Sequence, residues 1–319
     1  MAQATLSCPC GAIHLETPFL GFFRNYLPSR ISAYCYFFDS LKGQSPLSQK
    51  PGERTDILMI GGHVMRIVVK VGTSTLAHAT GRMNIRHVEE LVKVLSDLKN
   101  EGHQIILVSS GAIGMGVGKL NLPGRPGDMP TKQAAAAVGQ CELMYTYDRL
   151  FTQYNHTVAQ ILLTGEDVEH PSRRENFENT LERLLQLGAL PVINENDTVA
   201  TAEIKVGDND TLGAIVARCA RADLLVLLSD IDGLFTADPR KDPAARLIPV
   251  VEAIGPEIEA LAAGAGSDLG TGGMATKVRA AKMVTAAGCD MVIANGARPE
   301  VLYDIAEGKS AGTRFKAKI

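Results

Sequence analysis

From Met65 onward the chain alternates short apolar runs with amphipathic stretches, and this alternation constrains the fold more than any other feature. The apolar runs are rich in Val, Ile and Leu. Most are apolar throughout, which is typical of parallel strands that are covered on both faces. We predict strands at Ile67–Val71, Gln104–Ser109, Thr157–Leu163, Ala189–Asn194, Leu224–Ser229 and Asp290–Ala294.

The segments between these runs have the periodicity of helices. In Ile85–Asn100, one face is marked at helical spacing by Val88, Leu91, Val92, Leu95 and Leu98. Strands and helices that alternate through short loops predict an open, mostly parallel α/β sandwich. Ligands of such sheets bind beyond the carboxyl ends of the strands. Polar clusters at those ends are therefore the candidate site residues.

Residues 1–64 differ from the rest of the chain. They hold eight of the sixteen Phe and Tyr residues, show no sustained periodicity, and match neither a signal peptide nor a transit peptide. We therefore divide the chain into an N-terminal extension, residues 1–64, and a domain, residues 65–319. Two hypotheses for the extension stay open: a leader translated from a misassigned start, with Met65 as the true start, or a genuine but poorly ordered segment. We expect the domain to fold without it.

Charge and composition exclude several functional classes. The formal net charge is −3 and there is no long basic run, so nothing indicates a nucleic-acid or membrane surface. No apolar run reaches the roughly 18–20 residues that a membrane helix needs. The six cysteines lack the spacing of a zinc site. We predict free thiols, no metal held by protein ligands, and a reducing, cytoplasmic location.

Lys70 closes the first predicted strand and is followed by Gly72 and three hydroxyl residues. A lysine in a buried strand is costly unless its charge has a partner. A loop of glycine and hydroxyl residues can present N–H and O–H donors to phosphate. We predict that Lys70 binds a transferring phosphoryl group. The alternative is a strand-end lysine that extends its ammonium group into water.

Ser109, Ser110 and Gly111 close the second predicted strand and open a helix. Free N–H groups and the helix dipole favour an anion at such a turn. The alternative is an ordinary helix N-cap. The glycines that follow match neither the dinucleotide-binding motif nor the Walker P-loop.

Two clusters follow the fourth predicted strand, Asn194-Glu195-Asn196-Asp197 and Asp208-Asn209-Asp210. Amide and carboxylate side chains suit the ammonium and carboxylate groups of an amino acid. The alternative is a solvated polar loop.

Two more polar clusters lie at a strand end and before a helix. Ser229 and Asp230 lie at the end of the fifth predicted strand, and the glycine-rich stretch 270–277 ends on Lys277 at the start of a predicted helix, Ala275–Ala287. The glycine-rich stretch can form a second phosphate cradle, with Lys277 as a second cation. The alternative is a mobile glycine loop.

Together these motifs resemble the glutamate 5-kinases, a branch of the amino acid kinase family. The resemblance runs in order from Met65 to about Phe315. Single motifs are shared with aspartokinase, acetylglutamate kinase and uridylate kinase, whereas residues 194–210 combined with Gly-Thr-Gly-Gly-Met are specific to this branch. The matching motifs are Lys-x-Gly-Thr-Ser at 70–74, Ser-Ser-Gly-Ala at 109–112, Asn-Glu-Asn-Asp at 194–197, Val-Gly-Asp-Asn-Asp at 206–210 and Gly-Thr-Gly-Gly-Met-x-Thr-Lys at 270–277.

The resemblance implies a three-layer α/β/α sandwich, with glutamate on the N-terminal side and ATP on the C-terminal side. It implies ATP-dependent phosphorylation of the side-chain carboxylate of L-glutamate, with Mg²⁺ as cofactor, as the first step of proline biosynthesis. L-Proline is then an expected feedback inhibitor and a homo-oligomer the expected assembly. Many bacterial members carry a further C-terminal domain that this sequence does not include.

Site roles follow from the resemblance position by position. The implied catalytic residues are Lys70, Lys277, Asp210 and Lys205, with Asp210 orienting the lysines. The implied substrate-binding residues are Ser110, Asp197, Asn209, Asp208 and Asn194. The implied nucleotide-binding residues are Lys70, Ser229, Asp230, Thr271, Gly272, Gly273, Met274, Ala275, Thr276 and Lys277.

This chemistry agrees with the residues present. A carboxylate nucleophile, with a reference pKa of about 4.3, is already ionised at neutral pH and needs no general base. The reaction needs neutralisation of charge instead, because an anion attacks a polyanion.

Two alternatives remain. One is a kinase of the same fold acting on aspartate, acetylglutamate or a nucleoside monophosphate, although acetylglutamate lacks the ammonium that an Asp-rich loop fits. The other is a non-enzymatic sensor, which should have lost a cation or the orienting acid.

Overall fold

The structure, a computed structural model, describes residues 64–78, 82–200, 208–264 and 273–318. All of these residues belong to one unit of the chain, Met59–Ile319. Apart from Val64, the N-terminal extension lies outside the described residues.

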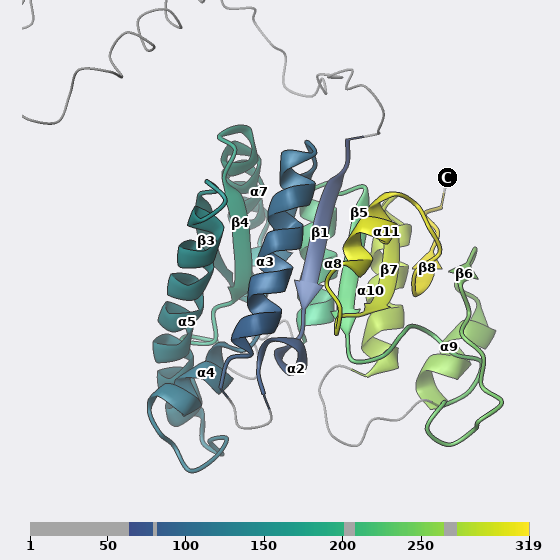
Figure 1. Ribbon diagram of the computed structural model, residues 1–319, viewed down its shortest axis with the longest axis horizontal. Helices are drawn as coiled ribbons and strands as arrows, with labels where there is room; N and C mark the ends of the chain where they lie inside the picture. Colours follow the sequence, from purple (N-terminus) through teal and green to yellow (C-terminus); the bar gives the residue numbers. More distant parts are fainter. Residues whose placement is uncertain (1–63, 79–81, 201–207, 265–272, 319) are drawn as a thin grey trace, which may run out of the picture. The chain divides into compact units, whose positions relative to one another are not determined.

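An eight-stranded sheet forms the centre of the domain, in the order β3-β4-β2-β1-β5-β7-β8-β6 (Figure 1). Its strand pairs are parallel, except that β7 and β8 run antiparallel. The strands are β1 Arg66–Val71, β2 Gln104–Val108, β3 Val158–Leu163, β4 Leu190–Glu195, β5 Leu224–Ser229, β6 Val250–Val251, β7 Asp290–Asn295 and β8 Thr313–Phe315.

The six predicted strands are confirmed, with ends that differ by at most one residue. The two strands that were not predicted, β6 and β8, have two and three residues. Runs of two or three residues are too short to show an alternation of apolar and polar residues. The position of β8 is set by its pairing with β7, in which Val292 is opposite Arg314.

Helices cover both faces of the sheet and complete the predicted three layers. Alternate strand residues face opposite cores: Val68 and Leu225 belong to one cluster, Val69 and Val226 to the other. The first core is closed by α7 Pro171–Gln186, α8 Asn209–Cys219 and α10 Met274–Thr285. The second is closed by α3 Ile85–Asn100, α5 Met129–Thr152 and α11 Val301–Ala306. The predicted helix Ile85–Asn100 is confirmed residue for residue.

The short helix α4, Ala112–Lys119, packs backbone to backbone on α5. A Cβ atom added at Gly116 would lie 1.8 Å from the carbonyl oxygen of Ala135, and one at Gly139 would lie 1.8 Å from that of Ala112. Gly111, just before α4, has a φ of 95°, which favours glycine. These glycines let the chain turn sharply after β2 and hold α4 against α5.

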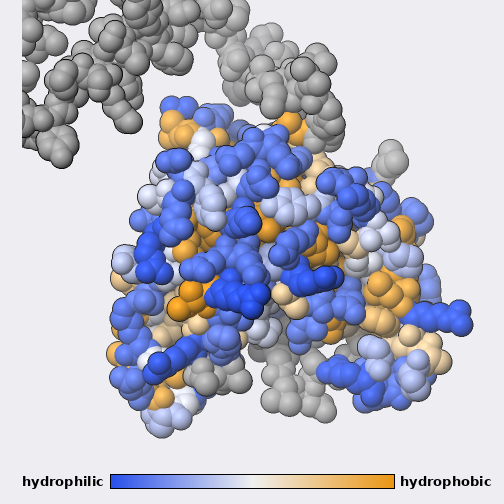
Figure 2. Space-filling model, in the orientation of Figure 1, coloured by the Kyte–Doolittle hydropathy of each residue, from blue (hydrophilic) through white to orange (hydrophobic). Residues whose placement is uncertain are grey.

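The remaining described helices are short: α2 Thr73–Leu76, α6 Gly165–Glu169 and α9 Pro256–Gly264. No helix among the described residues is both long and apolar enough to span a bilayer. The face that carries α3 and α5 is mainly hydrophilic, with small scattered apolar patches (Figure 2).

The six mutually parallel strands, β1 to β5 and β7, all end at the same edge of the sheet, the lower edge in Figure 1. Helix α4 begins after β2, and Lys70 is the penultimate residue of β1. The polar clusters of the sequence therefore meet at this edge, as the parallel topology requires.

Candidate active site

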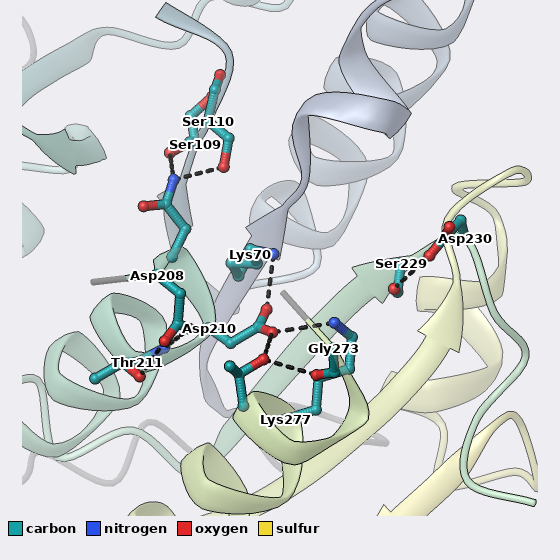
Figure 3. Close-up of polar contacts among 12 residues, drawn as sticks. Lys70, Ser109, Ser110, Asp208, Asp210, Thr211, Ser229, Asp230, Gly273 and Lys277 are labelled. Atoms are coloured by element: carbon teal, nitrogen blue, oxygen red, sulfur yellow. Dashed lines mark hydrogen bonds and ion pairs between the residues drawn. The ribbon is translucent and has the colours of Figure 1, made fainter. Parts of the chain in front are cut away.

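A buried carboxylate holds two lysines together at the carboxyl edge of the sheet. Asp210, in the first turn of α8, accepts from Lys70 Nζ of β1 at 2.7 Å and from Lys277 Nζ of α10 at 3.0 Å (Figure 3). Thr276 Oγ1 donates to the same carboxylate at 2.9 Å. The relative exposures of Asp210, Lys277 and Lys70 are 1, 3 and 8%. We call Lys70, Asp210 and Lys277 the central triad.

Electrostatics keep Asp210 charged. Burial opposes ionisation of Asp210, but the charges of Lys70 and Lys277 outweigh it and hold the pKa of Asp210 below its usual value. Because the pKa of Asp210 is lower in the folded chain, its ionised carboxylate contributes fully to the stability of the fold above the pKa of the unfolded chain, about 3.9. That stability is lost only as pH falls further, through the folded pKa. Asp210 is thus ionised across neutral pH.

The residue next to Asp210 connects the triad to the end of β2. Asn209 Nδ2 donates to the backbone oxygen of Ser109 at 2.9 Å and to Ser110 Oγ. Asp208 caps the N-terminus of α8 by accepting from the amide of Thr211 at 2.8 Å. The structure thus brings Ser110 and Asn209 together, and it shows Asp208 engaged in capping.

Asn194 lies at the neighbouring strand end, in β4, and is 2% exposed. Its Nδ2 donates to Gln140 Oε1 at 2.9 Å, and its Oδ1 accepts from the amide of Glu195 at 2.9 Å. Asn194 is therefore held by protein groups on both sides of its amide. Asp197 lies two residues beyond β4 and is partly exposed.

The proposed nucleotide side lies across β1 from these residues. Ser229, at the end of β5, donates to Asp230 Oδ1 at 3.1 Å. Gly273 precedes α10, and its backbone oxygen accepts from Thr276 Oγ1 at 2.7 Å. Met274 and Ala275 form the first turn of α10. Lys205, Thr271 and Gly272 lie outside the described residues.

One cavity of about 1350 Å³ connects the two groups of residues. It is lined on one side by Ser110, Asn194, Asp197, Asp208 and Asn209, on the other by Ser229, Asp230, Gly273 and Met274, and between them by Lys70, Asp210 and Lys277. A cavity with amides and acids at one end, glycine and hydroxyl groups at the other, and two cations between them suits group transfer between two ligands.

Sequence analysis missed three residues that also line this cavity, Arg125, Arg240 and Asn295. Asn295 ends β7, and its Nδ2 donates to Asp232 Oδ1 at 2.7 Å. Asn295 directly follows the predicted strand Asp290–Ala294, so the carboxyl-end rule could have found it. Arg125 and Arg240 lie in loops, where no pattern marks them.

Known proteins share the sequence pattern and the fold of this chain. The sequence pattern of the amino acid kinase family matches residues 65–295. The glutamate 5-kinase of Clostridium tetani is 56% identical over 254 residues, which are 80% of this chain and 95% of that protein. The glutamate 5-kinase of Listeria welshimeri is 52% identical over 257 residues, covering 79% of this chain and 93% of that protein.

Solved structures share the fold at low sequence identity. A carbamate kinase from Giardia lamblia bound to AMP-PNP has a TM-score of 0.59 at 16% identity, over 79% of this chain and 98% of that chain. An isopentenyl phosphate kinase from T. acidophilum has a TM-score of 0.55 at 16% identity, over 79% of this chain and 100% of that chain. From the sequence matches, this chain belongs to the amino acid kinase family and, within it, to the glutamate 5-kinases.

Proposed function

We propose that this chain phosphorylates the side-chain carboxylate of L-glutamate with ATP, giving L-glutamyl 5-phosphate and ADP, the first step of proline biosynthesis. The observation that carries the proposal is the central triad, which lies between the two ends of one cavity in a chain 56% identical to a glutamate 5-kinase.

The triad suits phosphoryl transfer because its charges do not cancel. Two lysines and one aspartate leave a net positive charge in a buried place, and a transferring phosphoryl group is negative. Positioning and electrostatic stabilisation supply nearly all of the catalysis in this reaction class. Asp210 holds both ammonium groups in place before the ligands arrive, so little reorganisation is needed.

The acceptor side suits a glutamate molecule. In the proposal Asp197 pairs with the α-ammonium group and Ser110 Oγ donates to a carboxylate oxygen. Asn209, whose Nδ2 donates to Ser109 and Ser110, offers its Oδ1 to the ammonium group. The γ-carboxylate then points toward Lys70 and Lys277. On the other side, the N–H groups at the start of α10 and the residues Ser229 and Asp230 would bind ATP phosphates and nucleoside.

Mg²⁺ is part of the proposal as the partner of the ATP phosphates, where it neutralises charge. Among the described residues no three His, Cys, Asp or Glu side chains form a dedicated metal cluster. Mg²⁺ commonly binds through one or two carboxylates plus substrate phosphates, so it would arrive with the nucleotide.

The direct test is ADP release measured with a panel of acceptors: L-glutamate, L-aspartate, N-acetylglutamate and UMP. The proposal expects turnover with glutamate that stops when Mg²⁺ is chelated, and little turnover with the others. Faster turnover with another acceptor would make the chain a different kinase of this fold, and nucleotide binding without turnover would make it a sensor.

Both lysines should be needed for turnover. We expect Lys70→Ala or Lys277→Ala to lower kcat by roughly 10²–10³, the loss typical of removing one electrostatic stabiliser. Lys282→Ala is a matched control, because Lys282 is on the same helix as Lys277 but is exposed and pairs with Glu259. If the Lys70→Ala or Lys277→Ala chain keeps a near-wild-type kcat while circular dichroism shows an intact fold, that lysine does not stabilise the transferring phosphoryl group.

The proposal extends to regulation, assembly and location. L-Proline keeps the ammonium and α-carboxylate groups of glutamate but has no carboxylate to phosphorylate, so it should compete at the acceptor end. We also propose a homo-oligomer, which light scattering would test, and a cytoplasmic location, which cell fractionation would test. The described cysteines, Cys141, Cys219 and Cys289, are free thiols, in keeping with a reducing compartment.

Asp197 should govern the affinity for amino acids and not for ATP. Asp197→Asn removes the anion proposed to pair with the ammonium group, so KM for glutamate and the inhibition constant of L-proline should rise together. KM for ATP should stay within about twofold. Steady-state kinetics with each substrate varied would show this. Equal rises in both KM values would mean that Asp197 serves the general fold. If millimolar L-proline does not inhibit the unsubstituted chain, the proposed feedback inhibition is wrong.

A further inference from the structure

Helix α5 carries two buried polar side chains, Gln140 and Tyr147, that reach the ends of strands and that the proposed function does not use. Gln140 is 7% exposed and Tyr147 0%. They are seven residues apart, which places them on one face of the helix. Burying a polar group is costly unless it is hydrogen-bonded, so each is expected to have a definite partner. Both partners lie at strand ends on the acceptor side of the cavity.

Tyr147 contacts the end of β2. Its hydroxyl group and Ser109 Oγ are 3.0 Å apart and share a hydrogen bond. The backbone oxygen of the same Ser109 accepts from Asn209 Nδ2 at 2.9 Å. Tyr147 therefore lies one residue away from a proposed glutamate contact. Burial raises the pKa of the Tyr147 hydroxyl well above its usual value, so it stays protonated and able to donate.

Gln140 contacts the end of β4. Its Oε1 accepts from Asn194 Nδ2 at 2.9 Å, which leaves Asn194 Oδ1 to accept from the amide of Glu195. Gln140 also lines a small cavity of about 10 Å³ together with Glu195 and Asp197. The side-chain nitrogen of Gln140 is buried and has no hydrogen-bond partner among the described residues.

The two contacts act on neighbouring strands. Val108 of β2 is in register with Ile193 of β4, and the amide of Ser109 donates to the backbone oxygen of Ile193 at 2.9 Å. Ser109 and Asn194, the next residues, are thus side by side at the edge of the sheet. One rigid helix fixes both strand ends from the same face.

We propose that Gln140 and Tyr147 are positioning residues for the acceptor end of the site: Tyr147 acts through Ser109 on Ser110 and Asn209, and Gln140 acts through Asn194 on the turn that carries Asp197. We call the pair the α5 clamp. The inference rests on the proposed function, because it names what holds the proposed glutamate contacts. The proposed nucleotide residues Ser229 and Asp230 lie at the end of β5, on the other side of β1 in the strand order, so the α5 clamp should leave ATP binding unchanged.

The test uses Tyr147→Phe and Gln140→Met, which keep most of the side-chain volume and remove the hydrogen bonds. Matched controls are Tyr145→Phe, where the residue is on the same helix and 62% exposed, and Gln153→Met at the exposed end of that helix. We expect each clamp variant to raise KM for glutamate about 3- to 10-fold, the effect of losing one buried hydrogen bond. KM for ATP should stay within about twofold of wild type.

A double variant separates positioning from general stability. If Tyr147 acts through Ser109, Tyr147→Phe combined with Ser109→Ala should raise KM for glutamate no more than Ser109→Ala alone. Three results would overturn the inference. They are equal rises in KM for glutamate and for ATP in the clamp variants, additive effects on KM in the double variant, and clamp variants with a lower melting temperature but unchanged kinetics. Failure of the proposed function would show differently, as absence of glutamate turnover in the unsubstituted chain.

Discussion

The carboxylate of Asp210, shared between Lys70 and Lys277, is the interaction on which the rest of the site depends. It joins three elements that are far apart in the sequence, β1, α8 and α10. Each lysine alone would be an expensive buried charge, and the carboxylate makes both tolerable. Breaking a buried pair by removing one partner typically costs about 3–5 kcal/mol, so the triad constrains the fold as well as the chemistry.

The triad also explains why the acceptor and nucleotide ends meet where they do. Asn209 precedes Asp210 in the first turn of α8, so the same turn reaches the end of β2 on one side and the two lysines on the other. An acceptor bound at Asn209, as we propose, would therefore be aligned with the cations by one helix turn. The parallel sheet supplies the edge at which these side chains meet, and α5 contacts that edge through Tyr147 and Gln140.

Much of this arrangement could be predicted from the sequence, because the strands are continuous apolar runs and parallel topology collects their ends. The resemblance implies that Asp210 orients Lys70 and Lys277, but the hydrogen bonds themselves, across 140 and 67 residues of sequence, follow from the packing of the three elements. The strands β6 and β8 are too short to carry a pattern. Gln140 and Tyr147 could not be assigned, since only the rotation of α5 against the sheet shows which of its polar residues face inward.

The most direct measurement is kcat for Asp210→Asn, with both substrates saturating and the fold checked by circular dichroism. Asparagine keeps the shape of the side chain but removes the negative charge that holds the two lysines in place. The account predicts a fall in kcat of roughly 10²-fold or more and a lower melting temperature, because two buried cations lose their shared partner. A folded Asp210→Asn chain that turns over glutamate within about threefold of wild type would contradict the central role of this carboxylate.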